Sequence, residues 1–180
     1  MCGTKSCAIL GHNPMRFAWG FDEEAAECHD MKMELAQQIM VLRQQGVTHF
    51  SVACDYGVGL YAAEIINALR NDDSELMLFC ITPYEEQATK WTPALRERYF
   101  DMLIKCTHMT AVSLHKQPDA QLKAYRTIIR QADMVLAVYD PASARGDDTD
   151  KAISYARELH RPMLMIPPDT LKTTYSCVEV

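Results

Sequence analysis

The stretch HFSVACDYGVGLYAAE, residues 49–64, decides the fold of this chain. It begins within a short β-branched and apolar run, residues 47–53, which is too short for a helix and typical of a buried strand. A polar break follows with two glycines one residue apart, and then a run rich in Ala, Ile and Leu that predicts a helix. A strand, a glycine loop and a helix in this order aim free backbone N–H groups at an anion.

The same alternation continues along the chain and predicts an α/β fold. Six strands alternating with five helices require a mostly parallel sheet with helices on both faces, a single three-layer α/β/α domain spanning residues 1–180. The tail, residues 167–180, is predicted to be flexible. The predicted strands are residues 5–10, 47–53, 75–81, 109–114, 134–139 and 162–166. The predicted helices are residues 23–45 (or 27–45, since either Glu23 or Glu27 can open the first helix), 58–70, 93–106, 120–131 and 149–160.

Composition and charge limit the classes of function. At 180 residues with 48% hydrophobic and 23% charged residues, the chain has the balance of a globular domain. A net charge of -6 argues against a nucleic-acid partner, because non-specific binding to nucleic acid needs a basic surface.

The cysteines and the apolar runs indicate a reducing compartment. The seven cysteines are odd in number and form no C-x-x-C pair, so no metal site is predicted, and the neighbouring Cys28 and His29 alone do not make one. No signal peptide and no apolar run of about 20 residues occur, so we expect no membrane segment. The predicted location is the cytoplasm.

The carboxyl ends of parallel strands meet at one edge of a sheet, where open α/β proteins bind ligands. Small or polar residues follow most of the predicted strands, which suits a pocket, although ordinary strand–helix turns have the same composition. The candidate ligand-binding residues are Gly11, Asn13, Asp55, Gly57, Gly59, Thr82, Asp140, Gly146 and Thr149.

Two residues at this edge are candidates for catalysis. His12 can act as an acid or a base near neutral pH, although a loop histidine can equally serve only as a hydrogen-bonding residue. Glu64 is placed to bind ribose hydroxyls or to stabilise a cationic sugar in a transition state. A solvated surface carboxylate is the alternative for Glu64.

Several blocks together resemble the YpsA-like branch of the SLOG superfamily, which includes DprA and LOG relatives. The first and third blocks are the most specific. The blocks are residues 11–14 with 17–23, residues 50–64, residues 82–87 with Trp91 and 96–99, and residues 133–140 with Thr149. The resemblance implies a Rossmann-like sheet with a pocket for a nucleotide or a nucleotide-derived ligand. Relatives in the superfamily cleave the N-glycosidic bond of nucleoside monophosphates or bind single-stranded DNA.

The chain departs from the family pattern at the loops that the resemblance assigns to the ligand. Asn13 stands where the family tends to have an arginine, which loses a bidentate phosphate donor. Ala53 and Gly59 replace a glycine and an aspartate, and Asp147-Asp148 replaces a Gly-Gly pair. Two carboxylates at a helix N-terminus repel a phosphate unless a cation intervenes, so Asp147 and Asp148 are candidate Mg²⁺ ligands. The predicted phosphate site is therefore weakened, moved or lost.

Three hypotheses of function follow. The first is a pocket for a nucleotide-like ligand, with N-glycosidic bond cleavage by a phosphoribohydrolase-like hydrolase if the protein is an enzyme. The second is a non-catalytic sensor or regulatory module that binds a small ligand or a protein partner. The third, binding of single-stranded DNA, fits neither the charge nor the aromatic content of 8%. A homodimer is the default expectation for such folds.

Overall fold

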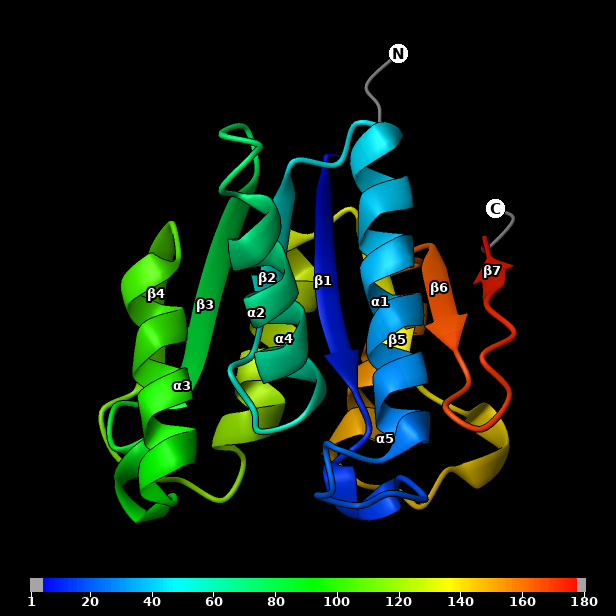
Figure 1. The fold of residues 1–180 in the computed structure, drawn as a ribbon. Coiled ribbons are helices and arrows are strands. Elements are labelled where there is room, and N and C mark those ends of the chain that lie inside the picture. The colour runs from blue at the N-terminus through cyan, green and yellow to red at the C-terminus, as the bar shows by residue number, and fades with distance from the viewer. Residues whose placement is uncertain (1–4, 178–180) are drawn as a thin grey trace.

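The apolar strands assemble into one seven-stranded sheet in the order β4-β3-β2-β1-β5-β6-β7 (Figure 1). The computed structural model describes residues 5–177. Strands β1 to β6 run parallel, and β7 pairs with β6 in the antiparallel direction. The strands are β1 (Ser6–Gly11), β2 (His49–Val52), β3 (Met77–Tyr84), β4 (His108–Ser113), β5 (Met134–Val138), β6 (Met163–Ile166) and β7 (Thr174–Ser176).

Helices cover both faces of the sheet. In Figure 1, α1, α2 and α3 lie in front of the sheet, and α4 and α5 lie behind it. The α-helices are α1 (Ala26–Gln44), α2 (Val58–Leu69), α3 (Pro93–Lys105), α4 (Ala120–Gln131) and α5 (Asp148–Glu158). Three short 3-10 helices follow β1, β3 and β5, namely η1 (Pro14–Arg16), η2 (Gln87–Lys90) and η3 (Pro141–Ser143).

The central strand β1 supplies both halves of the hydrophobic core. Cys7 and Ile9 pack with residues of α1 and α2, whereas Ala8 and Leu10 pack with residues of α4 and α5. Successive side chains of a strand point to opposite faces, and a strand buried on both faces is apolar at every position. This explains why the central strands β1 and β5 read as nearly continuous apolar runs.

The predicted α/β/α architecture with a mostly parallel sheet is confirmed, but the strand count was one too low. The missing strand, β7, lies in the segment predicted to be a flexible tail, where Leu164 of β6 pairs with Tyr175. Three residues are too few to show a strand period in the sequence. The last three residues of the predicted tail, 178–180, lie outside the described residues.

Strand β3 also continues beyond its predicted end at residue 81, through Pro83 to Tyr84. A proline has no N–H to donate, so in a strand with neighbours on both sides it leaves a ladder hydrogen bond unmade. Here β2 ends at Val52, opposite Cys80 of β3, so the last residues of β3 have only β4 as a partner. The shorter neighbour therefore makes Pro83 tolerable within the strand.

The strand order reverses between β1 and β5. Strands β2, β3 and β4 lie on one side of β1, and β5, β6 and β7 lie on the other. Loops that leave two adjacent parallel strands in opposite directions open a crevice at their carboxyl ends. Gly11, the last residue of β1, pairs with Val138, the last residue of β5, at this point.

Candidate functional site

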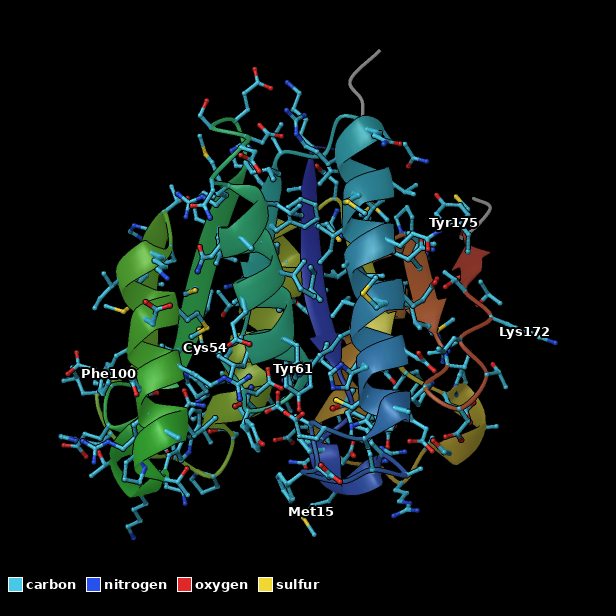
Figure 2. All side chains as sticks on the ribbon, in the orientation of Figure 1. Met15, Cys54, Tyr61, Phe100, Lys172 and Tyr175 are labelled. Carbon is cyan, nitrogen blue, oxygen red and sulfur yellow. The ribbon has the colours of Figure 1, made fainter. Side chains whose placement is uncertain are left out.

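The carboxyl ends of the parallel strands form one edge of the sheet, which we call the rim. It lies at the bottom of Figure 2, where Met15 is labelled in the turn after β1. The loops after β1, β2, β3 and β5 all start there, so the parallel register brings the predicted ligand-binding residues to this edge.

Three glycines at the rim make room for protein atoms. A Cβ atom on Gly11 would lie 2.5 Å from Val58 Cγ2, and one on Gly57 would lie 2.9 Å from Pro14 Cγ. A Cβ on Gly59 would lie 2.4 Å from Asp55 Oδ1. Side chains of the chain itself occupy the space where a Cβ would point, so packing alone accounts for these three glycines. Their role in ligand binding stays a prediction.

Gly11→Ala is expected to lower the free energy of unfolding by about 1–3 kcal/mol, because overpacking forces neighbouring atoms to move. The added methyl group meets Val58 and, at 3.0 Å, the carbonyl oxygen of Val138. Urea unfolding followed by circular dichroism measures the change. A second substitution, Val58→Ala, should restore part of the loss, whereas a Gly11→Ala midpoint equal to that of the wild type would contradict this packing.

His12 is buried and held in one orientation. Its backbone N–H donates to Val138 O at 3.0 Å, and its Nε2 accepts from the Asp140 N–H at 3.0 Å. Burial and the nearby charge of Arg16 lower the pKa of His12 to about 4, so the ring is neutral at pH 7. As placed, the ring joins the ends of β1 and β5. The role of His12 as an acid or a base stays a prediction.

Two of the other candidates cap short turns. The Asn13 side chain accepts from the Met15 N–H at 3.0 Å and begins η1. The Asp140 side chain accepts from the Ala142 N–H at 2.9 Å and begins η3. Aspartate and asparagine favour such positions because their short side chains bond the backbone two residues on.

The two threonines donate to backbone carbonyls. Thr149 Oγ1 donates to Gly11 O at 3.0 Å and ties the start of α5 to the end of β1. Thr82 Oγ1 donates weakly to Thr110 O at 3.4 Å on the neighbouring strand. The hydroxyl hydrogens of both residues are therefore engaged within the chain.

The loop between β5 and α5 holds an internal anion. Asp150 Oδ2 accepts from the backbone N–H groups of Arg145, Gly146 and Asp147 at 2.6, 2.6 and 3.1 Å, and Oδ1 accepts from the Tyr139 hydroxyl at 2.8 Å. Burial by itself would raise the pKa of Asp150, but these hydrogen bonds outweigh burial and hold the pKa well below its usual value. Gly146 thus offers its amide to a carboxylate of the chain, in the place predicted for a ligand.

Arg16 closes this loop from the other side. Its guanidinium lies 2.6 Å from Asp147 and 3.5 Å from Asp150, and it also donates to the backbone oxygen of Ser143. Asp147 in turn accepts from the Asp150 N–H at 3.0 Å, which completes a reciprocal cap of α5. The ion pair with Arg16 competes with the Mg²⁺ role expected for Asp147 and Asp148, which stays a prediction.

Glu64 belongs to an ion-pair network that we call the Arg98 network. Arg98 donates to both oxygens of Glu64 at 2.8 and 2.9 Å and to both oxygens of Glu23 at 2.7 and 3.0 Å. Lys32 adds a contact of 2.6 Å to Glu23. The network joins the loop before α1 to α1, α2 and α3, and both oxygens of the predicted catalytic carboxylate are engaged in it.

Asp55 differs from the other acidic groups at the rim. Its residue is 9% exposed, and Oδ1 has no hydrogen-bond partner among residues 5–177. Burial raises the pKa of Asp55 to about 6, while hydrogen bonding to its own backbone, to Tyr125 and to the backbone of Gly59 acts in the opposite direction. Within residues 5–177, no lysine or arginine is among the groups that shift it. Burying an ionised carboxylate without a cation costs free energy, and such groups are candidates for functional sites.

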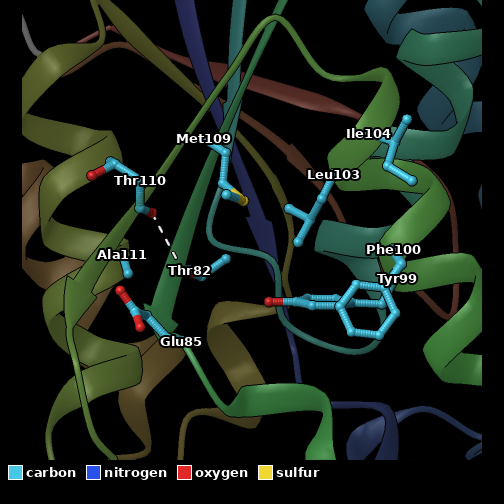
Figure 3. A pocket seen from close by; sticks show the side chains of 9 residues that line it. All are labelled: Thr82, Glu85, Tyr99, Phe100, Leu103, Ile104, Met109, Thr110 and Ala111. Carbon is cyan, nitrogen blue, oxygen red and sulfur yellow. Dashed lines mark hydrogen bonds between the residues drawn. The ribbon is translucent and has the colours of Figure 1, made fainter.

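A cavity of about 610 Å³ lies between α3 and the edge strand β4 (Figure 3). Its walls are mainly apolar, with Leu103, Ile104 and Met109 around it, and Thr82 and Glu85 bring polar atoms to it. No lysine or arginine lines it, so its chemistry does not suit a phosphate.

A second hollow, of about 590 Å³, lies beyond the ends of β3 and β4, and we call it the Trp91 hollow. It combines aromatic faces with two cationic side chains. Its lining residues are Tyr84, Glu86, Gln87, Thr89, Lys90, Trp91 and Lys116. Sequence reasoning missed this set, although the adjacent Lys90 and Trp91 in a polar segment were a usable signal.

Aromatic rings connect the Trp91 hollow to the loop after β2. The rings of Phe21 and Tyr56 stack with centroids 5.4 Å apart, and Tyr56 and Trp91 are 6.3 Å apart. Trp91 then meets Tyr99 edge to face at 5.0 Å. Phe21 is 55% exposed, so this row of four rings begins at the surface.

Within residues 5–177, no group of three or more His, Cys, Asp or Glu side chains is placed to hold a metal ion. In the same part of the chain, no helix is both long and apolar enough to cross a bilayer.

The fold is similar to that of DNA processing protein A from Helicobacter pylori, which binds single-stranded DNA. The two structures superpose with a TM-score of 0.58 at 14% identity, over 92% of this chain and 66% of that one. This likeness is one of fold. The prediction against a nucleic-acid partner was nevertheless wrong, because a protein with this fold binds single-stranded DNA. Net charge averages over the whole surface and does not describe one groove.

Sequence relatives lead to the family. A UPF0398 protein of Halalkalibacterium halodurans is 31% identical over 114 residues, which cover 61% of this chain and 59% of that protein. A UPF0398 protein of Bacillus cereus is 27% identical over 139 residues, covering 76% of this chain and 74% of the relative. The model of the YspA SLOG family (YpsA) matches residues 7–171. The chain therefore belongs to the YspA SLOG family.

Proposed function

We propose that this protein binds a nucleotide unit in the Trp91 hollow, with the base against Trp91 and the phosphate near Lys90 and Lys116. The observation that carries the proposal is the composition of this hollow, in which an aromatic face and two lysines line about 590 Å³. That volume lies within the range of small-ligand sites. Aromatic rings stack on bases of any identity, and lysine is a point charge for phosphate.

The arrangement of Glu64 favours binding without hydrolysis. A glycosidase of the predicted type needs a free carboxylate beside the sugar, and both oxygens of Glu64 are bonded to Arg98. Release of free base from any bound nucleotide, lost in Glu64→Gln, would overturn this part of the proposal and restore the predicted hydrolase.

A second candidate is single-stranded nucleic acid. The rings of Phe21, Tyr56 and Trp91 lie in a row with centroids 5.4 and 6.3 Å apart, and Phe21 at the end of the row is 55% exposed. Exposed aromatic rings stack on bases in single-strand-binding proteins. DNA processing protein A, with the same fold, binds such a ligand.

The test uses the emission of Trp91. In a Trp19→Phe background, where Trp91 is the remaining tryptophan, nucleoside monophosphates should quench the emission saturably. The double variant Lys90→Glu/Lys116→Glu should weaken binding by about tenfold or more, because two phosphate contacts are reversed. The control is Lys172→Glu, which replaces a positive charge by a negative one beside β7, at the edge of the sheet opposite to β4 (Figure 2).

The ligand length separates the two candidates. A twelve-residue oligothymidylate that binds about tenfold more tightly than thymidine monophosphate would identify single-stranded nucleic acid as the ligand. Equal affinities would identify the single nucleotide. If neither compound quenches Trp91, the proposal is wrong.

A further inference from the structure

The segment between Cys54 and Gly59 concentrates several unfavourable features in six residues. Cys54 adopts a left-handed backbone with φ of 52°, and Gly57 has φ of 118°. A residue other than glycine in this region costs about 1–3 kcal/mol, and such residues gather at ligand clamps and active sites. Asp55 and Tyr56 lie between these two positions.

The lack of a side chain at Gly59 leaves room for the carboxylate of Asp55. The Gly59 backbone has no positive φ, so its conformation is open to any residue. A Cβ atom there would lie 2.4 Å from Asp55 Oδ1 and 3.2 Å from Asp55 Cγ. The carboxylate of Asp55 therefore fills the space beside Gly59 at the start of α2.

Among residues 5–177, the carboxylate of Asp55 has polar partners but no charged one. Its pKa is influenced by hydrogen bonding to the Tyr125 hydroxyl from α4, to the backbone of Gly59 from α2 and to its own backbone. No lysine or arginine is among them. Oδ1 has no hydrogen-bond partner among residues 5–177 and is shielded from solvent. An ionised carboxylate accepts hydrogen bonds and cannot donate them, so the missing partner is an N–H or O–H group.

The loop that carries Asp55 is connected to the Trp91 hollow on both sides. The carbonyl oxygen of Cys54 accepts from Gln87 Nε2 at 3.1 Å, and Gln87 lines the hollow. The Tyr56 ring lies 6.3 Å from the Trp91 ring. A ligand in the hollow that moved either contact would also move the backbone of Asp55.

We propose that Asp55 is a ligand-recognition residue, whose free oxygen accepts hydrogen bonds from a pair of N–H or O–H donors on the bound nucleotide. This inference rests on the proposed nucleotide site. Two parts of a nucleotide present such a pair, namely the N1–H and amino edge of guanine and the ribose diol. Asp55 is not among the described residues that line the Trp91 hollow, and its Oδ1 is buried, so in both cases binding by Asp55 requires the β2–α2 loop to open and bring Oδ1 to the ligand.

The experiment compares the wild type with Asp55→Asn, which keeps the shape of the side chain and replaces the carboxylate. Affinities for GMP, AMP and ribose 5-phosphate are measured by isothermal titration calorimetry, and Asp169→Asn, an exposed carboxylate change, is the control. Asp55→Asn should weaken at least one ligand by about tenfold, the cost of one charge-assisted hydrogen bond. Loss confined to GMP identifies the base, and equal loss for all three identifies the ribose.

The failure of this inference differs from that of the proposed function. If GMP and AMP quench Trp91 and Asp55→Asn binds all three ligands within threefold of the wild type, the role of Asp55 is wrong and the Trp91 hollow stands. If no nucleotide binds to the wild type, both are wrong. Gly59→Ala is a second variant, since its methyl group displaces the Asp55 carboxylate and should weaken the same ligands.

Discussion

Asp150→Ala is expected to lower the free energy of unfolding by about 3–5 kcal/mol, the largest loss for one substitution at the rim. The carboxylate accepts the backbone N–H groups of residues 145, 146 and 147 and the Tyr139 hydroxyl. It also lies 3.5 Å from the guanidinium of Arg16, whose side chain is 7% exposed. Removal leaves donors without partners in a partly buried loop, and each such donor costs free energy.

Thermal unfolding measures this effect against a matched control. For a chain of this size, the expected loss corresponds to a fall in Tm of roughly 6–20 °C. Asp148→Ala changes a carboxylate two positions earlier in the same helix turn, where residues 5–177 supply it with no side-chain hydrogen bond or ion pair. It should cost about 1 kcal/mol or less, through the helix dipole. Equal Tm values for the two variants would contradict the role of Asp150 as the internal anion.

The fold was predictable because the hydrophobic pattern of each main strand and helix matches its burial in the three-layer structure. β5 is buried at every position and β1 at every position after Ser6, so each reads as a nearly uninterrupted apolar run. The two errors have local causes. Pro83 ended the predicted third strand, but the early end of β2 removes the need for its N–H. β7 is short and exposed, and it depends on pairing with β6 rather than on its own sequence.

The site was less predictable, because the same residues serve the chain itself at the rim. Gly11 and Gly57 match a ligand loop in sequence, yet their missing side chains make room for Val58 and Pro14. Such contacts join distant segments and leave no local pattern. The pair Asp147 and Asp150 is different, since D-x-x-D before a helix is a capping pattern that could have been read directly.

The pH dependence of stability should reveal the cost of Asp55. Its pKa rises from the ordinary 3.8 to about 6 on folding, so the folded protein binds the proton more tightly than the unfolded chain. The stability that this group contributes is therefore full below pH 3.8 and is lost as the pH rises through about 6. At about 1.4 kcal/mol for each tenfold change in proton affinity, the loss at pH 8 is at most about 3 kcal/mol.

Asp55→Asn should therefore be more stable than the wild type at pH 8, by about 1–3 kcal/mol, and the difference should vanish near pH 4. Urea unfolding of both proteins at several pH values isolates Asp55, because other titrating groups are common to the two. Asp169→Asn, at an exposed position, should follow the wild type throughout within about 0.5 kcal/mol. A gain in stability combined with weaker nucleotide binding would mean that the chain keeps a destabilising carboxylate for its ligand. If Asp55→Asn were less stable than the wild type at pH 8, Asp55 would instead be a residue that stabilises the fold.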